Sequence, residues 1–229
     1  MYYSAETVHG CFVCLARSQN DGRTFEKPMN LGAVEFAGST QQNNIVLQLS
    51  KPNPLANASV PAGLQTFANV FMDDRPGVPV SERYKLTAAA KGDMALQLFG
   101  SANGVRWKLL STGGSNQMGL WSDVADTQPI TFWDKRANRY QTYGRFEPQR
   151  RKCQRGLWAS RMVGYSAAEV GGSLFSKWSN PTTALGFPES GPCTDTYNSA
   201  AVQRGNAYVS AGSSLCRLQS KSSTALHRL

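Results

Sequence analysis

The sequence predicts an all-β protein. Short runs rich in aromatic and β-branched residues recur along it, and Gly, Pro, Asn, Asp and Ser separate them at roughly the 8 to 12 residues typical of all-β folds. No segment shows the periodicity of an amphipathic helix. With 229 residues and 41% hydrophobic content, the chain can bury the core of one large domain or two small ones.

Each expected strand is an apolar or aromatic run that ends at a turn signal. In chain order the runs are "CFVCLA" (11–16), "NIVLQL" (44–49), "ALQLFG" (95–100), "VRWKLL" (105–110), "ITFWD" (130–134), "RYQTYGRF" (139–146) and "GLWASRM" (156–162). The first two bracket a long, polar, glycine-punctuated stretch, residues 25–47, without a helical stripe. Such a stretch between two short strands is expected to be a connection between neighbouring sheets.

Two phrases alternate along the chain. The first is a small polar residue, a turn and an aromatic residue beside basic ones, as in "SQNDGRTFEKP", "SANGVRWKLL" and, more weakly, "SLFSKWSNP". The second is an acid, a short strand, a turn and a tyrosine-bearing strand, as in "DDRPGVPVSERYKLTAAA", "DTQPITFWDKRANRYQTYGRF" and "DTYNSAAVQRGNAYVSAG". Each repeat therefore predicts a small antiparallel sheet, and radial stacking of such sheets, as in a β-propeller, protects their edges.

The same phrases resemble a known family. "CLARSQNDGRTFEKPMNLGAVEFAGSTQQNNIVL", "VFMDDRPGVPVSERYKL", "SANGVRWKLL" and "DTQPITFWDKRANRYQTYGRF" are similar to five-bladed β-propeller proteins related to the N-terminal domain of glycoside hydrolase family 32. The resemblance implies a partial propeller of about four blades over residues 1–208. The first blade and the closing strands are expected to be missing, and residues 209–229, Ser-rich and free of acids, to form an irregular or disordered tail.

The resemblance also implies chemistry. Hydrolysis of a glycosidic bond needs two carboxyl groups that face each other across it, and propellers of this kind supply acids from several blades to an axial pocket. Asp73 best matches a family acid, Asp126 opens the segment that the family writes "DSQN", and Glu147 is a candidate proton donor. The expected substrate-binding residues are Gln128, Arg145 and Asp195.

Structural alternatives stay open for these residues. Asp73 can cap the turn into "RPGVP", Asp126 can be a turn residue, and Glu147 can form an exposed ion pair. Asp134 is expected to be a turn residue with Trp133 packed beneath it.

Two further structural roles follow from local sequence. Glu82 and Arg83 are expected to pair at a strand start, and Asp21 with Gly22 to supply the backbone geometry of a hairpin turn.

The charge and cysteine patterns argue against other classes. The formal charge of +9 raises the possibility of nucleic-acid binding, but Arg204, Arg217, Lys221 and Arg228 follow the last acid. The basic segment "RFEPQRRKCQR" lacks aromatic residues interleaved for stacking on bases, so a solvated hairpin is the expectation.

Cys11 and Cys14 form a C-x-x-C without a second pair, which favours small apolar strand residues over a zinc site. No apolar run is long enough for a membrane-spanning helix, and the first residues do not resemble a signal peptide.

We therefore expect a monomer with a carbohydrate ligand, no cofactor or metal, and no nucleic-acid or membrane partner. The sequence leaves two functions open, a glycoside-hydrolase-like enzyme and a non-catalytic carbohydrate-binding or interaction propeller, and does not indicate a compartment.

Overall fold

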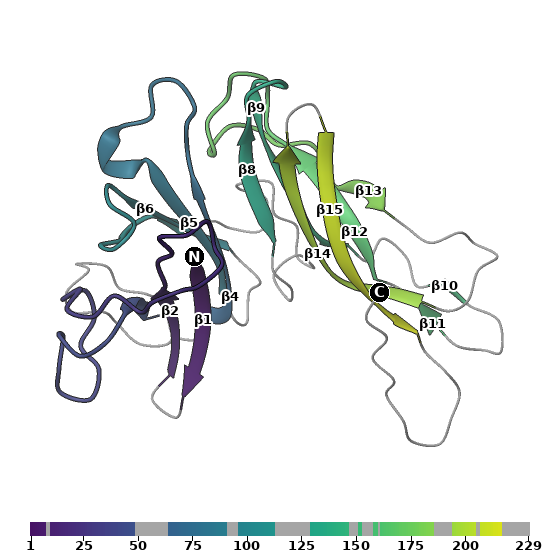
Figure 1. Cartoon of the computed structure of the whole chain (residues 1–229). Coiled ribbons are helices and arrows are strands. Elements are labelled where there is room, and N and C mark those ends of the chain that lie inside the picture. The colour runs from purple at the N-terminus through teal and green to yellow at the C-terminus, as the bar shows by residue number, and fades with distance from the viewer. Residues whose placement is uncertain are drawn as a thin grey trace, which may run out of the picture. The chain divides into compact units, whose positions relative to one another are not determined.

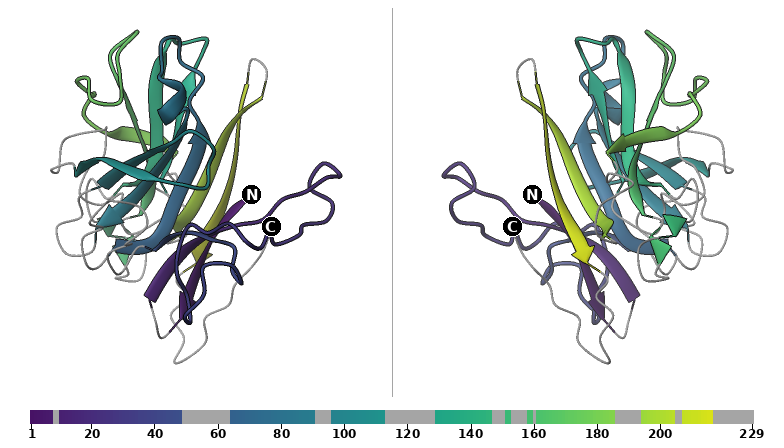
Figure 2. Two further views of the ribbon diagram at one scale, coloured as in Figure 1. Left: turned by 90° about the vertical axis from the view of Figure 1, so that its left-hand side faces the viewer. Right: turned by 90° about the vertical axis from the view of Figure 1, so that its right-hand side faces the viewer.

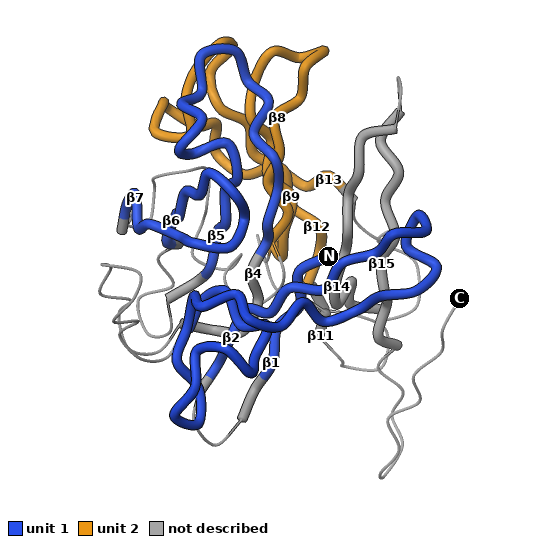
Figure 3. The backbone as a smooth tube through the Cα atoms, turned by 60° about the vertical axis from the view of Figure 1, so that its left-hand side comes forward, with its two compact units in different colours: residues 1–115 blue, residues 116–229 orange. Residues whose placement is uncertain are grey.

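The computed structural model describes residues 1–7, 10–48, 64–90, 96–112, 129–146, 151–152, 158–159, 161–185, 194–204 and 207–216. This part of the chain contains strands, turns and one short 3-10 helix, η1 (Val80–Glu82), but no α-helix (Figure 1). The chain divides into two compact units, residues 1–115 and 116–229 (Figure 3). The prediction of an all-β protein is confirmed.

Unit 1 begins with a three-stranded antiparallel sheet in the order β1-β2-β3. Its strands are β1 (Tyr2–Thr7), β2 (Gly10–Leu15) and β3 (Ile45–Gln48). The long polar stretch joins β2 to β3 and extends from the sheet as a loop (Figure 2); because both strands belong to one sheet, the expectation that it connects neighbouring sheets is wrong. Two asparagines fix its end, because Asn44 Nδ2 donates to the Leu15 carbonyl (2.7 Å) and Asn43 Nδ2 donates to the Val34 carbonyl (3.0 Å).

The second sheet of unit 1 is a four-stranded antiparallel meander in the order β4-β5-β6-β7. Its strands are β4 (Leu64–Met72), β5 (Tyr84–Ala90), β6 (Leu96–Ser101) and β7 (Lys108–Thr112). The segment between β4 and β5 was expected to contain a short strand, yet it forms a turn and η1. Pro76 and Pro79 explain the difference, since a proline has no amide hydrogen to donate to a sheet.

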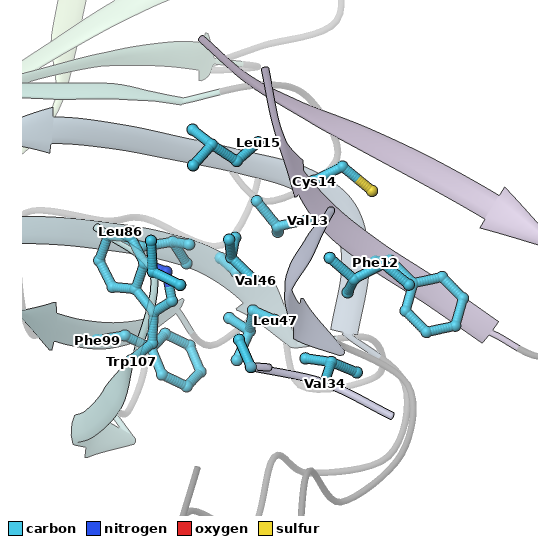
Figure 4. Close-up of a cluster of buried hydrophobic side chains, with 14 residues drawn as sticks. Phe12, Val13, Cys14, Leu15, Val34, Val46, Leu47, Leu86, Phe99 and Trp107 are labelled. Carbon is cyan, nitrogen blue, oxygen red and sulfur yellow. The ribbon is translucent and has the colours of Figure 1, made fainter. Parts of the chain in front are cut away.

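The core of unit 1 joins these two sheets. Leu47 and Val46 of β3 belong to the same buried cluster as Leu86 of β5, Phe99 of β6 and Trp107 (Figure 4). The long connection adds Ala33 and Val34 to this cluster, so it is part of the core as well as a link. Each fully buried Val, Leu or Phe side chain of the cluster contributes about 1.5 to 3 kcal/mol to the stability of the folded state.

Unit 2 contains a second four-stranded antiparallel sheet, in the order β13-β12-β9-β8. Its strands are β8 (Ile130–Asp134), β9 (Arg139–Phe146), β12 (Met162–Ala167) and β13 (Thr182–Leu185). Between β9 and β12 the chain forms two short antiparallel strands, β10 (Arg151–Lys152) and β11 (Trp158–Ala159). Strand β10 therefore belongs to the basic segment "RFEPQRRKCQR".

The last described element is the antiparallel hairpin of β14 (Thr194–Arg204) and β15 (Ala207–Cys216), a long two-stranded ribbon in Figure 2. β15 continues to Cys216, beyond residue 208, so the first part of the segment expected to be irregular is a strand. Residues 217–229 lie outside the described residues.

The small-polar phrase forms the same kind of loop in three places, each between the last two strands of a sheet. In the first, Ser18 Oγ accepts hydrogen bonds from the backbone amides of Asn20 (3.3 Å) and Gly22 (2.8 Å). In the second, Ser101 Oγ accepts from the amides of Asn103 (3.3 Å) and Gly104 (3.0 Å). The third follows the pattern more loosely.

In that third loop Ser173 Oγ accepts from the amide of Phe175 at 3.1 Å. In the first loop Asp21 and Gly22 adopt φ angles of 56° and 82°. These are the left-handed values that a primed hairpin turn needs, so the structural role predicted for this pair is confirmed.

The described sheets are antiparallel and open. Four-stranded antiparallel meanders occur as blades in β-propellers, but a propeller and its number of blades remain predictions.

Candidate functional site

The candidate site lies where β4 ends, around Asp73. The Asp73 amide donates to the Arg83 carbonyl (2.7 Å), which closes the segment between β4 and β5 into a loop. Lys85, the second residue of β5, approaches the Asp73 carboxylate from the opposite strand with Nζ at 3.5 Å from Oδ2. Both side chains are buried, with 1% of Asp73 and 5% of Lys85 exposed.

Glu82 completes the cluster from η1. Its Oε2 lies 3.5 Å from Lys85 Nζ, and the Lys85 ammonium also donates to the Glu82 backbone carbonyl. The Glu82 side chain is 35% exposed, so it is the carboxylate of the cluster that solvent reaches. Gly100 of β6 leaves space beside it, because a Cβ there would lie 3.2 Å from Glu82 Cγ and closer still to Leu110.

The three side chains form a compact arrangement of charges, which we call the Asp73 cluster. Lys85 Nζ is 3.5 Å from a carboxylate oxygen of each acid, so the two oxygens are no further apart than twice that distance. Carboxyl groups that cleave glycosidic bonds stand roughly 5 to 10 Å apart. The upper limit on the separation of the two oxygens overlaps that range, although one acid is buried and bound to a cation.

Asp73 also fulfils the structural alternative considered for it. The amide of Arg75 donates to Asp73 Oδ1 at 3.3 Å, which is the hydrogen bond of an Asx turn. Glu82 was expected to pair with Arg83, whereas the ion pair that it forms is with Lys85. The Arg83 guanidinium lies 5.5 Å from the centre of the Tyr84 ring, and its Nη2 approaches Met72 Sδ at 3.3 Å.

Lys85 is the residue that sequence reasoning missed. The run "RYKLTAAA" offered a signal, because a lysine stands inside an otherwise apolar strand. A buried lysine needs an anionic partner, and an acid at the end of the neighbouring strand could have been sought on that ground.

The other predicted site residues belong to unit 2. Asp126, Gln128 and Glu147 lie outside the described residues. Asp195 lies in β14 with its backbone opposite Leu215 in β15, and its side chain is outside the described part of the chain. Arg145 is half-buried in β9, opposite Val163 of β12. Their roles at an axial pocket therefore remain predictions.

Asp134 has the turn role that the sequence predicted. It is fully buried at the end of β8, and its Oδ1 accepts from the amides of Arg136 (2.9 Å) and Ala137 (3.2 Å). Its Oδ2 accepts from Gln141 Nε2 at 2.6 Å. Trp133 packs edge-on against Tyr140 across the same hairpin, with the ring centres 4.9 Å apart.

The C-x-x-C forms part of strand β2, as expected. Neither Cys11 nor Cys14 is in a disulfide; Cys11 is half-buried and Cys14 is buried, and burial raises the pKa of the Cys14 thiol. Among the residues that the structure describes, no group of three or more His, Cys, Asp and Glu side chains could hold a metal ion. No helix in the same part of the chain has the length and apolar character to cross a membrane.

Comparison of the chain with protein-family models, with curated proteins and with solved structures found no match in any of the three.

Proposed function

We propose that this chain is a carbohydrate-active protein of the β-propeller type, similar to glycoside hydrolases, that binds a glycoside at the Asp73 cluster. The observation that carries the proposal is the pair of carboxylates, Asp73 and Glu82, held around the single ammonium of Lys85 at the end of a four-stranded antiparallel sheet. Ionised carboxylates accept hydrogen bonds from hydroxyl groups, and charge-assisted bonds of this kind are among the strongest in proteins.

The exposures of the two acids suggest different roles. Glu82, with about a third of its side chain exposed, is the group that a sugar hydroxyl can reach. Asp73 is buried against Lys85 and balances its charge, and in this position it orients the ammonium. This division favours binding over turnover, because a hydrolase needs both carboxyl groups at the scissile bond.

Hydrolysis is the second candidate, because the upper limit on the separation of the two carboxylates overlaps the range that this chemistry uses. If the Asp73 cluster hydrolyses a glycoside, one of its two acids must donate a proton to the leaving oxygen, and the other must act as a base or a nucleophile. We therefore separate binding from turnover in the experiment.

The test uses the full chain and a panel of neutral oligosaccharides that differ in sugar and linkage. Binding is measured by surface plasmon resonance, and turnover by the release of reducing ends. Glu82→Gln should weaken binding of the best ligand by at least about tenfold, the effect of losing one charged hydrogen bond. Glu35→Gln is the matched control, because Glu35 is an exposed glutamate of the same unit.

Asp73→Asn is informative only if circular dichroism shows a folded protein, since it removes the buried carboxylate that pairs with the Lys85 ammonium. The proposal fails if no oligosaccharide of the panel binds, or if Glu82→Gln and Glu35→Gln behave alike. If an oligosaccharide binds and no reducing ends are released, the chain does not hydrolyse the sugars of the panel, and the proposal of a binding function stands.

A further inference from the structure

A second surface that can bind a ligand lies in unit 2, on the loop between β12 and β13. It is a groove of about 550 Å³. Among the polar and aromatic residues that line it are Arg139, Tyr165, Glu169, Lys177, Trp178 and Asn180. We call it the Trp178 groove.

Two residues that line the Trp178 groove, Arg139 and Tyr165, are held by contacts with each other and with Tyr143. Arg139 Nη2 donates to Tyr165 Oη at 3.1 Å, and the Tyr165 ring packs against Tyr143 with the ring centres 5.2 Å apart. Arg139 Nε is buried and has no hydrogen-bond partner among the described residues. A guanidinium has five N–H donors, so this one is not saturated by the hydrogen bonds of the described protein.

Trp178 is also held in place by its contacts. Trp178 Nε1 donates to the Leu174 carbonyl (3.1 Å), and the Trp178 backbone forms a β-bridge with Ala168. On the other side, the amide of Ser179 donates to the Ala167 carbonyl at 2.9 Å. The half-buried indole is therefore a rigid apolar surface, which costs little conformational entropy to use in binding.

The charges of the groove favour an anion. Arg139 and Lys177 are cationic, and Glu169 is the acid among the lining residues. Glu169 and Lys177 lie across the loop from each other, linked by a backbone hydrogen bond of 3.0 Å from the Glu169 amide to the Lys177 carbonyl. Because the Lys177 side chain is exposed, its ammonium can move towards a bound molecule without disturbing the protein core.

We propose that the Trp178 groove binds a saccharide that carries a carboxylate, with the sugar ring against Trp178 and the carboxylate between Arg139 and Lys177. A planar guanidinium matches the two oxygens of a carboxylate. Asn180 supplies an amide that both donates to and accepts from hydroxyl groups. The inference goes beyond the proposed function, because this site consists of residues of unit 2 and uses none of the Asp73 cluster.

The acid in the groove argues against a polyanion as the ligand. A nucleic-acid backbone presents closely spaced phosphates, for which proteins use a continuous basic surface, and Glu169 interrupts such a surface here. A single carboxylate on a sugar requires one cationic position, which Arg139 and Lys177 provide.

The test titrates the full chain with a galactose tetramer whose terminal sugar is galacturonic acid, the acid tetramer, and, in parallel, with the neutral tetramer of galactose, by isothermal calorimetry. The acid tetramer should bind at least about tenfold more tightly than the neutral one, because the charged hydrogen bonds are lost with the carboxylate. Lys177→Met should weaken binding of the acid tetramer about fivefold or more and leave the neutral one unchanged. Lys108→Met, an exposed lysine in β7 of unit 1, is the matched control.

A second measurement locates the ligand. Binding of the acid tetramer should change tryptophan fluorescence in the wild type, and Trp178→Phe should abolish that change while circular dichroism remains that of a folded protein. The inference is overturned if the acid tetramer does not bind, if Lys177→Met and Lys108→Met bind it equally, or if the fluorescence change survives Trp178→Phe. If Glu82→Gln alone removes binding, the acid sugar belongs to the Asp73 cluster and the Trp178 groove has no part in it.

Discussion

Replacing Gly104 with alanine tests a contact between the two sheets of unit 1, because the added methyl group would strike Tyr2 of the other sheet. It lies in the loop between β6 and β7 with φ at 72°, and its carbonyl accepts a hydrogen bond of 2.9 Å from Tyr2 Oη in β1. A Cβ built on Gly104 would collide with that same Tyr2 oxygen. Gly104→Ala therefore perturbs both the backbone and a contact between elements far apart in sequence.

The expected loss of stability has two parts. A left-handed backbone costs a residue with a Cβ roughly 1 to 2 kcal/mol. Displacing the Tyr2 hydroxyl loses a hydrogen bond worth about 1 kcal/mol. We therefore expect Gly104→Ala to lower the free energy of unfolding of unit 1 by about 2 to 3 kcal/mol.

Urea unfolding measures the effect, with hydrogen exchange of unit 1 peptides to assign the transition. Gly38→Ala is the matched control, because Gly38 has φ at 77° but no atom within 4 Å of its Cβ position. It should show the backbone part alone, about 1 to 2 kcal/mol.

A double-mutant cycle with Tyr2→Phe isolates the collision. Since Tyr2→Phe removes the oxygen that the new methyl group would strike, the double variant should be more stable than the sum of the single effects predicts, by about 1 kcal/mol. Additivity within about 0.5 kcal/mol, or equal losses for Gly104→Ala and Gly38→Ala, would show that the collision with Tyr2 contributes nothing to the loss of stability.

Three further outcomes are expected. Burial, and then the neighbouring Tyr84, raise the pKa of Tyr2 to about 12 from its usual 10, so the folded state retains the Tyr2 proton longer than the unfolded state does; stability should fall between pH 10 and 12, and by less in Tyr2→Phe, in urea titrations across that range. Iodoacetamide should label Cys11 faster than Cys14 at pH 8, since Cys14 is buried with a raised pKa, and equal rates by mass spectrometry would contradict this. Asp134→Ala should destabilise unit 2 by about 2 to 4 kcal/mol in urea unfolding, because it removes a buried acceptor of two amides and the Gln141 side chain, whereas a loss below about 0.5 kcal/mol would show that water replaces the carboxylate.

Local sequence predicted many of the strands. "ITFWD" and "RYQTYGRF" coincide with β8 and β9, and the turn between them is capped by Asp134 as expected. These features depend on side chains that alternate along a strand and on an aspartate that bonds to nearby amides, and both effects act within a few residues. The prediction of strand boundaries was less accurate in two other segments.

"GLWASRM", expected as one strand, contributes to β11 and to the start of β12. In "VRWKLL" the strand begins only at Lys108, because the Ser101 loop extends further along the chain. Boundaries of this kind depend on which backbone partner is available across the sheet, and a single sequence does not contain that information.

The candidate site illustrates the same limit. Asp73 stood out because it precedes a proline-rich turn and matches an acid of the resembled family. The ion pair with Lys85 depends on the antiparallel register of β4 and β5, in which Phe71 faces Lys85. The Trp178 groove likewise brings together residues of β9, β12 and the loop after it. None of these partners is marked by its spacing in the sequence.

Short strands, the turns of the small-polar phrases and the Asp21–Gly22 turn could all be predicted from the amino-acid sequence. Those properties follow from interactions between residues close together in the chain, so composition and spacing are sufficient to predict them. Three other features became visible in the folded chain alone: the connection between β2 and β3 enters the core, Lys85 is a partner of Asp73, and a groove forms around Trp178. Each of these depends on strand pairing and sheet packing, which bring distant residues together and which side-chain chemistry alone does not specify.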